Sequence, residues 1–317
     1  YELGVGNLQV AEGNGHFMMK DNGKWLSNLG GDRLYWANFS KLGASVVIGE
    51  EITYLHSGLF CDDSLLESIT INCDLEFLGV GTFYNTPGLN SVALNGSIEY
   101  IFGFTDVFND DFYTWLTPLE KEQIMYYGAF ESCVNLSEVL FVEGEELLTI
   151  GDKAFYRCTA LKSIKLPERT LSLGENCFDG SGLSDIDFGG VRTIAANAFG
   201  NTKSLSVLTI PASVTEIGKY AFRSSAISEI KFAPRATGKE ETPFEPLKLG
   251  ESVFTYCASL KKATFPDGLT SIPDSTFYNC AALTYVYVPK TVANGDDVVA
   301  GVSGFARAIG PRAFYHC

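Results

Sequence analysis

The sequence repeats one phrase along most of its length, and this repetition limits the folds that the chain can adopt. The clearest copy begins at Ile150 and follows the pattern I-G-x-x-A-F-x-x-C-x-x-L-x-x-I-x-L-P, ending at Pro167. Other copies begin at Leu55, Leu78, Met125, Leu173, Ile194, Ile217, Leu249, Ile272 and Ile309. A spacing of 23 residues recurs between successive copies, as from Ile150 to Leu173. Such a period is typical of stacked units that bury their apolar faces only against their neighbours.

The secondary structure of one repeat follows from its apolar pattern. Ile164 and Leu166 are expected to point into the core, while Ser163 and Lys165 point outward, because alternation with period two predicts a strand. Pro167 ends this strand, since it cannot donate to a strand ladder. The A-F-x-x-C segment is too short for a full helix and predicts a single helical or 3-10 turn. Each repeat of about 23 residues should therefore hold one short strand and one such turn.

Two residue types recur at fixed places in the phrase and predict columns inside the stack. A buried aromatic column is expected from Phe83, Phe130, Phe155, Phe178, Phe199, Phe222, Phe254, Phe277 and Phe314. The slot three residues later holds Cys133, Cys158, Cys257, Cys280 and Cys317. Stacked Cβ vectors run parallel, which disfavours disulfides, so these cysteines predict a buried ladder of free thiols. The remaining cysteines, Cys61, Cys73 and Cys177, have no partner that the sequence identifies.

The repeated phrase resembles the BspA-like leucine-rich repeat, also called the Treponema pallidum type, over roughly residues 55–317. The resemblance implies a curved, right-handed leucine-rich-repeat solenoid of the α/β class, rich in β-structure, with about ten repeats. It also implies a surface or secreted protein of host-associated bacteria or of some parasitic protists. Some members of the family act as adhesins for host matrix proteins or for other bacteria. The family has no catalytic residues to carry over.

The phrase also suggests how the chain is divided. Residues 55–317 form the solenoid in this interpretation, with lengthened connections at 95–124, 233–248 and 290–308. Residues 1–54 lack the phrase and are rich in glycine, asparagine and aromatic residues. Terminal repeats need shielding, so we expect these residues to form an N-terminal cap. A remnant of a separate upstream domain is the alternative.

Composition excludes several classes of partner. The chain has 317 residues, 38 acidic against 23 basic side chains and a net charge of −15. Nucleic acids and anionic membrane surfaces require clustered cations, so neither is an expected partner. No run of about 18 apolar residues occurs, and we expect no membrane insertion in this segment. The chain begins at Tyr1 without a signal-like stretch, which suggests a trimmed or processed form.

The sequence offers little for catalysis or metal binding. His16, His56 and His316 lie far apart in the repeat, and no zinc, phosphate or serine-hydrolase motif is present. Among the acidic clusters, Asn294-Gly295-Asp296-Asp297 is the best calcium candidate, but we interpret it as a solvated turn. We therefore predict no enzyme activity, no cofactor and no metal site.

The strongest functional signal is the array of outward strand positions. In successive repeats this array reads Ser68/Thr70, Ser91/Ala93, Glu138/Leu140, Ser163/Lys165, Asp185/Asp187, Val207/Thr209, Glu229/Lys231, Lys262/Thr264 and Tyr285/Tyr287. Tyrosine is enriched at contact surfaces. Tyr285 and Tyr287, with Lys262 and Lys231 nearby, are therefore the best candidates for an anchoring patch. Further candidates on the array are Glu229, Asp185, Asp187 and Lys165. The alternative is that the aromatic residues merely favour strands.

These observations lead to two functional hypotheses. The first is a non-catalytic recognition or adhesion module, extracellular or on a cell surface, that binds a host or microbial surface protein. It would use the exposed strand face and the long loops, because loops on a rigid scaffold often carry binding. The second is a structural spacer or self-assembling solenoid that displays other domains. Glycan binding is a variant of the first hypothesis.

Overall fold

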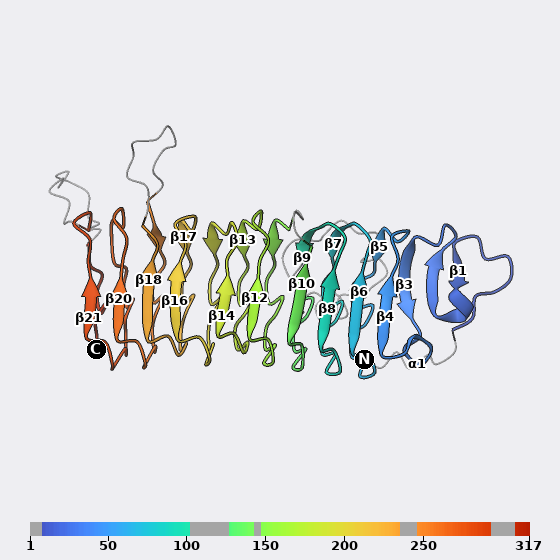
Figure 1. Cartoon of the computed structure of the whole chain (residues 1–317), viewed down its shortest axis with the longest axis horizontal. Coiled ribbons are helices and arrows are strands. Elements are labelled where there is room, and N and C mark those ends of the chain that lie inside the picture. The colour runs from blue at the N-terminus through green and yellow to red at the C-terminus, as the bar shows by residue number, and fades with distance from the viewer. Residues whose placement is uncertain (1–7, 102–126, 143–146, 235–245, 293–307) are drawn as a thin grey trace, which may run out of the picture. The chain divides into compact units, whose positions relative to one another are not determined.

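Figure 1 shows the chain as a computed structural model, which describes residues 8–101, 127–142, 147–234, 246–292 and 308–317. The chain divides into two compact units, Tyr1–Gly190 and Val191–Cys317. Within each unit the backbone coils through successive turns, and short strands of neighbouring turns pair in parallel. The leucine-rich-repeat solenoid expected from the sequence is therefore confirmed.

The first unit contains a main ladder, built from the L-x-x-I-x-L stretches, and a second ladder. The main-ladder strands are β4 (Ser45–Ile48), β6 (Ser68–Ile71), β8 (Ser91–Leu94), β10 (Glu138–Phe141), β12 (Ser163–Lys165) and β14 (Asp185–Asp187). The second-ladder strands are β7 (Leu75–Leu78), β9 (Ile98–Ile101), β11 (Thr149–Ile150) and β13 (Ser172–Leu173). Strands β4, β6, β8 and β10 form one sheet, and β12 and β14 form another.

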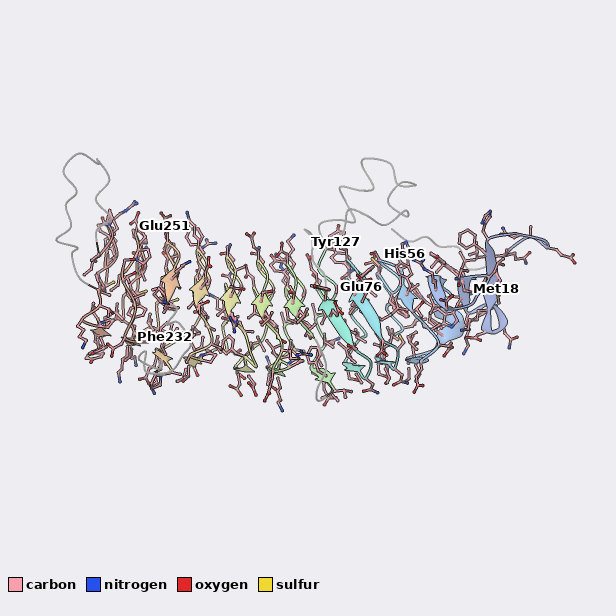
Figure 2. The ribbon with its side chains drawn as sticks, turned by 90° about the horizontal axis from the view of Figure 1, so that it is seen from above. Met18, His56, Glu76, Tyr127, Phe232 and Glu251 are labelled. Atoms are coloured by element: carbon pink, nitrogen blue, oxygen red, sulfur yellow. The ribbon has the colours of Figure 1, made fainter. Side chains whose placement is uncertain are left out.

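The second unit repeats this arrangement. Its main-ladder strands are β16 (Val207–Ile210), β18 (Glu229–Phe232), β20 (Lys262–Thr264) and β21 (Tyr285–Tyr287). Its second-ladder strands are β15 (Thr193–Ile194), β17 (Glu216–Ile217) and β19 (Lys248–Leu249). Figure 2 shows Phe232, at the end of β18, and Glu251, just after β19, on opposite sides of this unit. The two ladders therefore present separate surfaces.

The strand phase predicted from the sequence is confirmed. In β12, Ile164 is buried between the exposed Ser163 and Lys165, and Leu166 is buried after them. Strands β14 and β16 show the same alternation of exposed and buried side chains. The apolar side chains thus enter the core of each turn, while every second residue of the main ladder reaches solvent.

The helical or 3-10 turn expected in each repeat takes a different form. The A-F-x-x-C segments consist of consecutive tight turns, and the helices of the described residues, η1 (Asp21–Gly23) and α1 (Phe39–Leu42), precede them. In the clearest copy, Lys153 and Arg157 have φ values of 55° and 59°. A left-handed residue interrupts a right-handed helix, so two of them in five positions prevent a regular turn of helix.

The aromatic column is confirmed and begins one turn earlier than predicted. In the first unit the rings of Phe60, Phe83, Phe130, Phe155 and Phe178 stack in sequence, with neighbouring centroids 5.0–5.4 Å apart. In the second unit the column comprises Phe199, Phe222, Phe254, Phe277 and Phe314, with centroids 5.3–5.5 Å apart. All are fully buried except Phe314, which is 38% exposed. The expectation of burial was therefore wrong for Phe314 alone.

The cysteine ladder is also confirmed, with one exception. All eight cysteines are free thiols, and those of the predicted ladder are buried except Cys317, which is exposed. The sulfur of Cys158 donates a hydrogen bond to the carbonyl of Phe130, one turn earlier, at 3.1 Å. The sulfur of Cys280 bonds the Phe254 carbonyl in the same way at 3.0 Å. The slot therefore supplies a hydrogen bond between turns as well as apolar packing.

At the start of the first unit, the chain also forms a small sheet from β1 (Phe17–Lys20), β2 (Trp25–Asn28), β3 (Arg33–Ala37) and β5 (Tyr54–Leu55). Strands β1, β2 and β3 are antiparallel, whereas β3 pairs in parallel with β5. Strand β4 already pairs in parallel with β6, so the main ladder starts at Ser45. The cap hypothesis and its boundary at residue 54 remain predictions.

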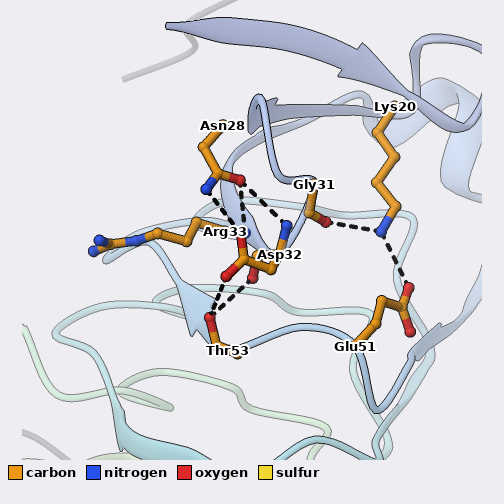
Figure 3. A network of polar contacts seen from close by, with 7 residues as sticks. All are labelled: Lys20, Asn28, Gly31, Asp32, Arg33, Glu51 and Thr53. Carbon is orange, nitrogen blue, oxygen red and sulfur yellow. Dashed lines mark hydrogen bonds and ion pairs between the residues drawn. The ribbon is translucent and has the colours of Figure 1, made fainter.

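A polar network closes the β2–β3 turn and joins it to the segment before β5 (Figure 3). The Asn28 side chain donates to Asp32 Oδ1 at 2.8 Å and accepts the N–H groups of Asp32 and Arg33 at 3.2 and 3.1 Å. The Thr53 hydroxyl donates to Asp32 Oδ2 at 2.9 Å. Hydrogen bonds from Asn28 and Thr53 lower the pKa of Asp32 below its ordinary value. Asp32 therefore links the hairpin to the first turn as a charged acceptor.

Candidate interaction surface

The structure brings five of the eight predicted site residues together on the main ladder of the second unit. These residues, which we call the lysine–tyrosine face, are Glu229, Lys231, Lys262, Tyr285 and Tyr287. The tyrosine side chains are 50% and 46% exposed. The other three candidates, Lys165, Asp185 and Asp187, lie in the first unit.

Parallel register aligns the lysine–tyrosine face in two rows. Glu229 of β18 pairs with Lys262 of β20, which pairs with Tyr285 of β21. The second row contains Thr209, Lys231, Thr264 and Tyr287, again in direct register. Strands of a sheet lie about 4.8 Å apart, so side chains of one row contact each other directly.

One carboxylate joins the two lysines of this face. Glu229 Oε1 lies 3.2 Å from the Lys262 ammonium nitrogen, and Glu229 Oε2 lies 3.4 Å from that of Lys231. The hydrogen bond from Lys262, supported by the one from Lys231, holds the pKa of Glu229 below its ordinary value. The Lys262 ammonium also lies over the Tyr285 ring, 5.6 Å from its centroid. The face is therefore an ordered network, although exposed ion pairs contribute little to stability.

The three candidates of the first unit form a smaller group of their own. Strands β12 and β14 pair in parallel, which places Asp185 beside Ser163 and Asp187 beside Lys165. All three candidate side chains are exposed. Asp187 Oδ1 accepts the N–H of Gly189 at 3.1 Å, so this carboxylate also closes the turn after β14. The group is acidic, in contrast to the lysine–tyrosine face.

Sequence reasoning did not single out several residues that border the lysine–tyrosine face. Thr209 and Thr264 place hydroxyl groups in its second row, and Lys261 is exposed just before β20. Val207, 52% exposed, extends the first row next to Glu229. The outward array already contained Val207 and both threonines, and their position in the array was the signal that could have identified them.

A second aromatic group, on the β3–β5–β7 side of the first unit, was not predicted. The ring of Tyr35 lies 5.5 Å from that of Phe17 and 6.0 Å from that of Tyr54, which in turn lies 6.0 Å from Phe77. The Arg33 guanidinium lies 4.3 Å from the centre of the Tyr54 ring. These rings pack mainly edge to face against one another, an arrangement that stabilises aromatic pairs. We interpret them as packing that joins the N-terminal strands to the first turns.

The described residues contain no group of three or more histidine, cysteine or acidic side chains that could hold a metal ion. The calcium candidate at residues 294–297 lies outside the described residues. Asp63 is buried, and its carboxylate accepts the N–H groups of Leu65 and Leu66 at 2.8 and 3.3 Å, which is a structural role.

A shallow depression of the second unit is lined by Tyr256, Asn279, Ala281, His316 and Cys317. In the part of the chain that the structure describes, no helix is long and apolar enough to span a membrane.

Comparison with known families agrees with the repeat geometry. The model of the BspA type leucine rich repeat region matches the chain in six copies, over residues 36–111, 123–246 and 192–298. These matches cover well over half of the sequence and include both units. None of the curated proteins matches the sequence.

Solved structures of bacterial leucine-rich-repeat proteins resemble this chain. A leucine-rich repeat protein from Bacteroides ovatus is 20% identical, with 95% of this chain and 78% of that chain covered and a TM-score of 0.54. The pneumococcal vaccine antigen PcpA is 17% identical, with 87% and 71% covered and a TM-score of 0.45. The T. pallidum leucine rich repeat protein is 14% identical, with 89% and 84% covered and a TM-score of 0.31. The first of these supports a shared fold.

Proposed function

The chain belongs to the BspA-type leucine-rich-repeat family, and from this premise we propose that it is a non-catalytic recognition module. Its partner is a host or microbial surface protein, and its place is extracellular or on a cell surface. The lysine–tyrosine face is the contact surface in this proposal. The family relationship supports a protein-interaction or scaffold role, and the surface location rests on what the resemblance of the repeat implies.

The observation that carries the proposal is the contrast between the inside and the outside of each turn. The buried positions repeat nearly unchanged, as the stacked phenylalanines show. The exposed pairs of the main ladder change from turn to turn, although serine fills the first position of β4, β6 and β8, and they end in Tyr285 and Tyr287, each about half exposed. Large aromatic side chains on a rigid sheet are effective anchors for a partner, because they lose little conformational freedom on binding.

The experiment is to screen the purified chain for binding to an array of host matrix proteins, mucins and microbial surface proteins. The test variant is Tyr285→Ala with Tyr287→Ala, and the matched control is Tyr256→Ala with Tyr315→Ala. The control tyrosines are each 48% exposed and belong to the turn segments of the same unit. We expect a partner whose binding is lost in the test variant and retained in the control.

Thermal unfolding completes this test. The test variant should unfold within about 1 kcal/mol of the wild type, because exposed side chains contribute little to stability. If both tyrosine pairs reduce binding equally, the lysine–tyrosine face is not the contact surface. If no member of the array binds the chain, and the protein is monodisperse and stable, the spacer hypothesis replaces the proposal. Binding to mucin sugars alone would favour a glycan as the partner.

A further inference from the structure

We propose that the lysine–tyrosine face binds a carboxylate-rich segment of an acidic protein. This inference rests on the proposed recognition function and specifies the chemistry of its partner. It follows from the charge, the hydrogen-bonding groups and the ring contacts of the face.

The charge of this face opposes that of the whole chain. The chain carries a net charge of −15, yet the face contains Lys231 and Lys262 against the single carboxylate of Glu229. Lys261 is exposed beside it and adds a further positive charge. A local positive patch on an acidic molecule steers an anionic segment towards that patch and repels it elsewhere.

The groups on this face are mostly hydrogen-bond donors. Each lysine ammonium has three N–H donors, and one contact from each reaches Glu229. The hydroxyl groups of Tyr285, Tyr287, Thr209 and Thr264 add donors in the same two rows. A ligand that satisfies the ammonium groups must supply acceptors and negative charge, and carboxylates supply both; the hydroxyl groups can donate to the same acceptors. Lys231 and Lys262 already converge on one carboxylate, so their spacing suits a second.

The ring contacts favour an acidic polypeptide over a sulfated glycan. Sugars bind tyrosine by stacking on the ring, but the Lys262 ammonium already lies over the Tyr285 ring. Glu229 stands between the two lysines and would repel a densely sulfated chain. A polypeptide with spaced carboxylates avoids this repulsion and can place its apolar side chains on the exposed Val207 and Tyr287.

The direct test uses poly-L-glutamate as the probe and measures its affinity for the whole chain. The test variant is Lys231→Gln with Lys262→Gln. The matched control, Lys41→Gln with Lys162→Gln, makes the same change in net charge on exposed residues of the first unit that lie outside the candidate site. We expect the test variant to weaken binding at least tenfold and the control to change it less than twofold. Circular dichroism verifies that both variants are folded.

A second variant makes the inference sharper, because it predicts a gain. Glu229→Gln removes the negative charge between the lysines, and we expect it to bind poly-L-glutamate about three- to tenfold more tightly. An equal loss of affinity for poly-L-glutamate in the test variant and in the lysine control would mean attraction by overall charge and would overturn the inference. Binding of heparin without binding of poly-L-glutamate would overturn it in favour of a sulfated glycan. A concentration-dependent dimer that the lysine variant abolishes would overturn it in favour of a second copy of the chain.

The outcomes also separate this inference from the proposed function. A partner from the array that depends on Tyr285 and Tyr287, but binds normally to the lysine variant, would overturn the inference and leave the recognition function standing. Failure of the recognition function would appear as an array without any tyrosine-dependent partner.

Discussion

Three residues after each phenylalanine of the column other than Phe60 lies a position that we call the slot; after Phe60 this position is Asp63. Successive turns place Thr86, Cys133, Cys158, Ser181, Thr202, Ser225, Cys257, Cys280 and Cys317 there. All of them are small, and all carry an O–H or S–H group. Thr86 bonds the Phe60 carbonyl at 2.8 Å, as Cys133 bonds that of Phe83 at 2.9 Å. Thr202 instead bonds the Phe199 carbonyl of its own turn at 2.9 Å, and the buried Ser181 hydroxyl has no hydrogen-bond partner. The slot therefore holds small side chains with an O–H or S–H group, and most of those described use that group as a donor.

Replacing Cys158 tests this interpretation. Cys158→Ser should change the free energy of unfolding by less than about 1 kcal/mol, because serine occupies the same slot elsewhere. Cys158→Val has a similar size but no donor, and it should cost about 1–3 kcal/mol by removing the bond to the Phe130 carbonyl. Urea unfolding followed by circular dichroism measures both. Equal stability of the two variants would mean that packing alone determines the slot.

Glu131 makes a second prediction at the residue scale, because it is a nearly buried carboxylate. Burial raises its pKa, although the Gly128 N–H, Lys153 and Arg157 act in the opposite direction. A raised pKa means that the folded state holds the proton more tightly than the unfolded state. The stability contribution of Glu131 is therefore lost as the pH rises from about 4.5, the ordinary value, through the raised value.

Glu131→Gln keeps an acceptor for the Gly128 N–H and removes the charge. We expect this variant to have a higher Tm than the wild type at pH 7, and the difference should disappear below about pH 4. The control is Glu138→Gln, an exposed carboxylate in β10 of the same unit. A Tm difference that does not depend on pH would contradict this account of Glu131.

At the scale of elements, the sequence predicts strands better than turns. The strand phase is visible because burial on one face requires an apolar residue at every second position, as at Ile164 and Leu166. The tight turns cannot be predicted from the sequence, because residues such as Lys153 and Arg157 occupy their left-handed positions. Neither residue type indicates a positive φ, as glycine or asparagine would. Neighbouring turns impose this conformation through backbone hydrogen bonds that a single repeat does not reveal.

The lysine–tyrosine face was predictable only in part for a related reason. Outward orientation of Tyr285 and Tyr287 follows from the strand phase, and the structure agrees. The bridge from Lys231 through Glu229 to Lys262 depends on the register between β18 and β20, which are separated by the lengthened connection at 233–248. Register across such a connection comes from the stacking of the turns, so the sequence alone leaves it open.

The aromatic column makes a prediction about how turns depend on one another. Phe222 lies between Phe199 and Phe254, with centroid distances of 5.3 and 5.5 Å. Phe222→Ala should lower the free energy of unfolding by about 3–5 kcal/mol, because it leaves a cavity in a fully buried column. Hydrogen exchange should speed up in both adjacent turns as well, since each turn is stabilised by its neighbours.

The control for this prediction is Phe232→Ala. Phe232 is half-buried and lies outside the column, with its ring tilted against Phe265 at 5.4 Å. Its replacement should destabilise the protein less than that of Phe222. Faster exchange confined to the turn of Phe222 itself would contradict the dependence of each turn on its neighbours.

At the scale of the whole molecule, the distribution of thiols makes the last prediction, since all eight cysteines lie within the described residues. Burial raises the pKa of Cys133 to about 12 and that of Cys257 to about 11, and it raises the pKa of Cys61 to about 12. The thiolate is the reactive form, so these thiols should react poorly with a thiol reagent at pH 8. Cys317 is the exposed thiol and should be the first to react.

We therefore expect close to one thiol to react rapidly in the native protein and all eight to react in 8 M urea without a reductant. Cys317→Ser should remove the rapid phase and leave seven thiols after unfolding, because six of the other thiols are buried and the half-buried Cys61 has a raised pKa. Fewer than eight thiols in unfolded wild type would reveal a disulfide and contradict the free-thiol ladder. Rapid reaction of several thiols in the native state would mean that the turns open readily, because reaction requires the core between turns to be exposed. One rapid thiol and seven slow ones would instead show that the stack is closed along both units.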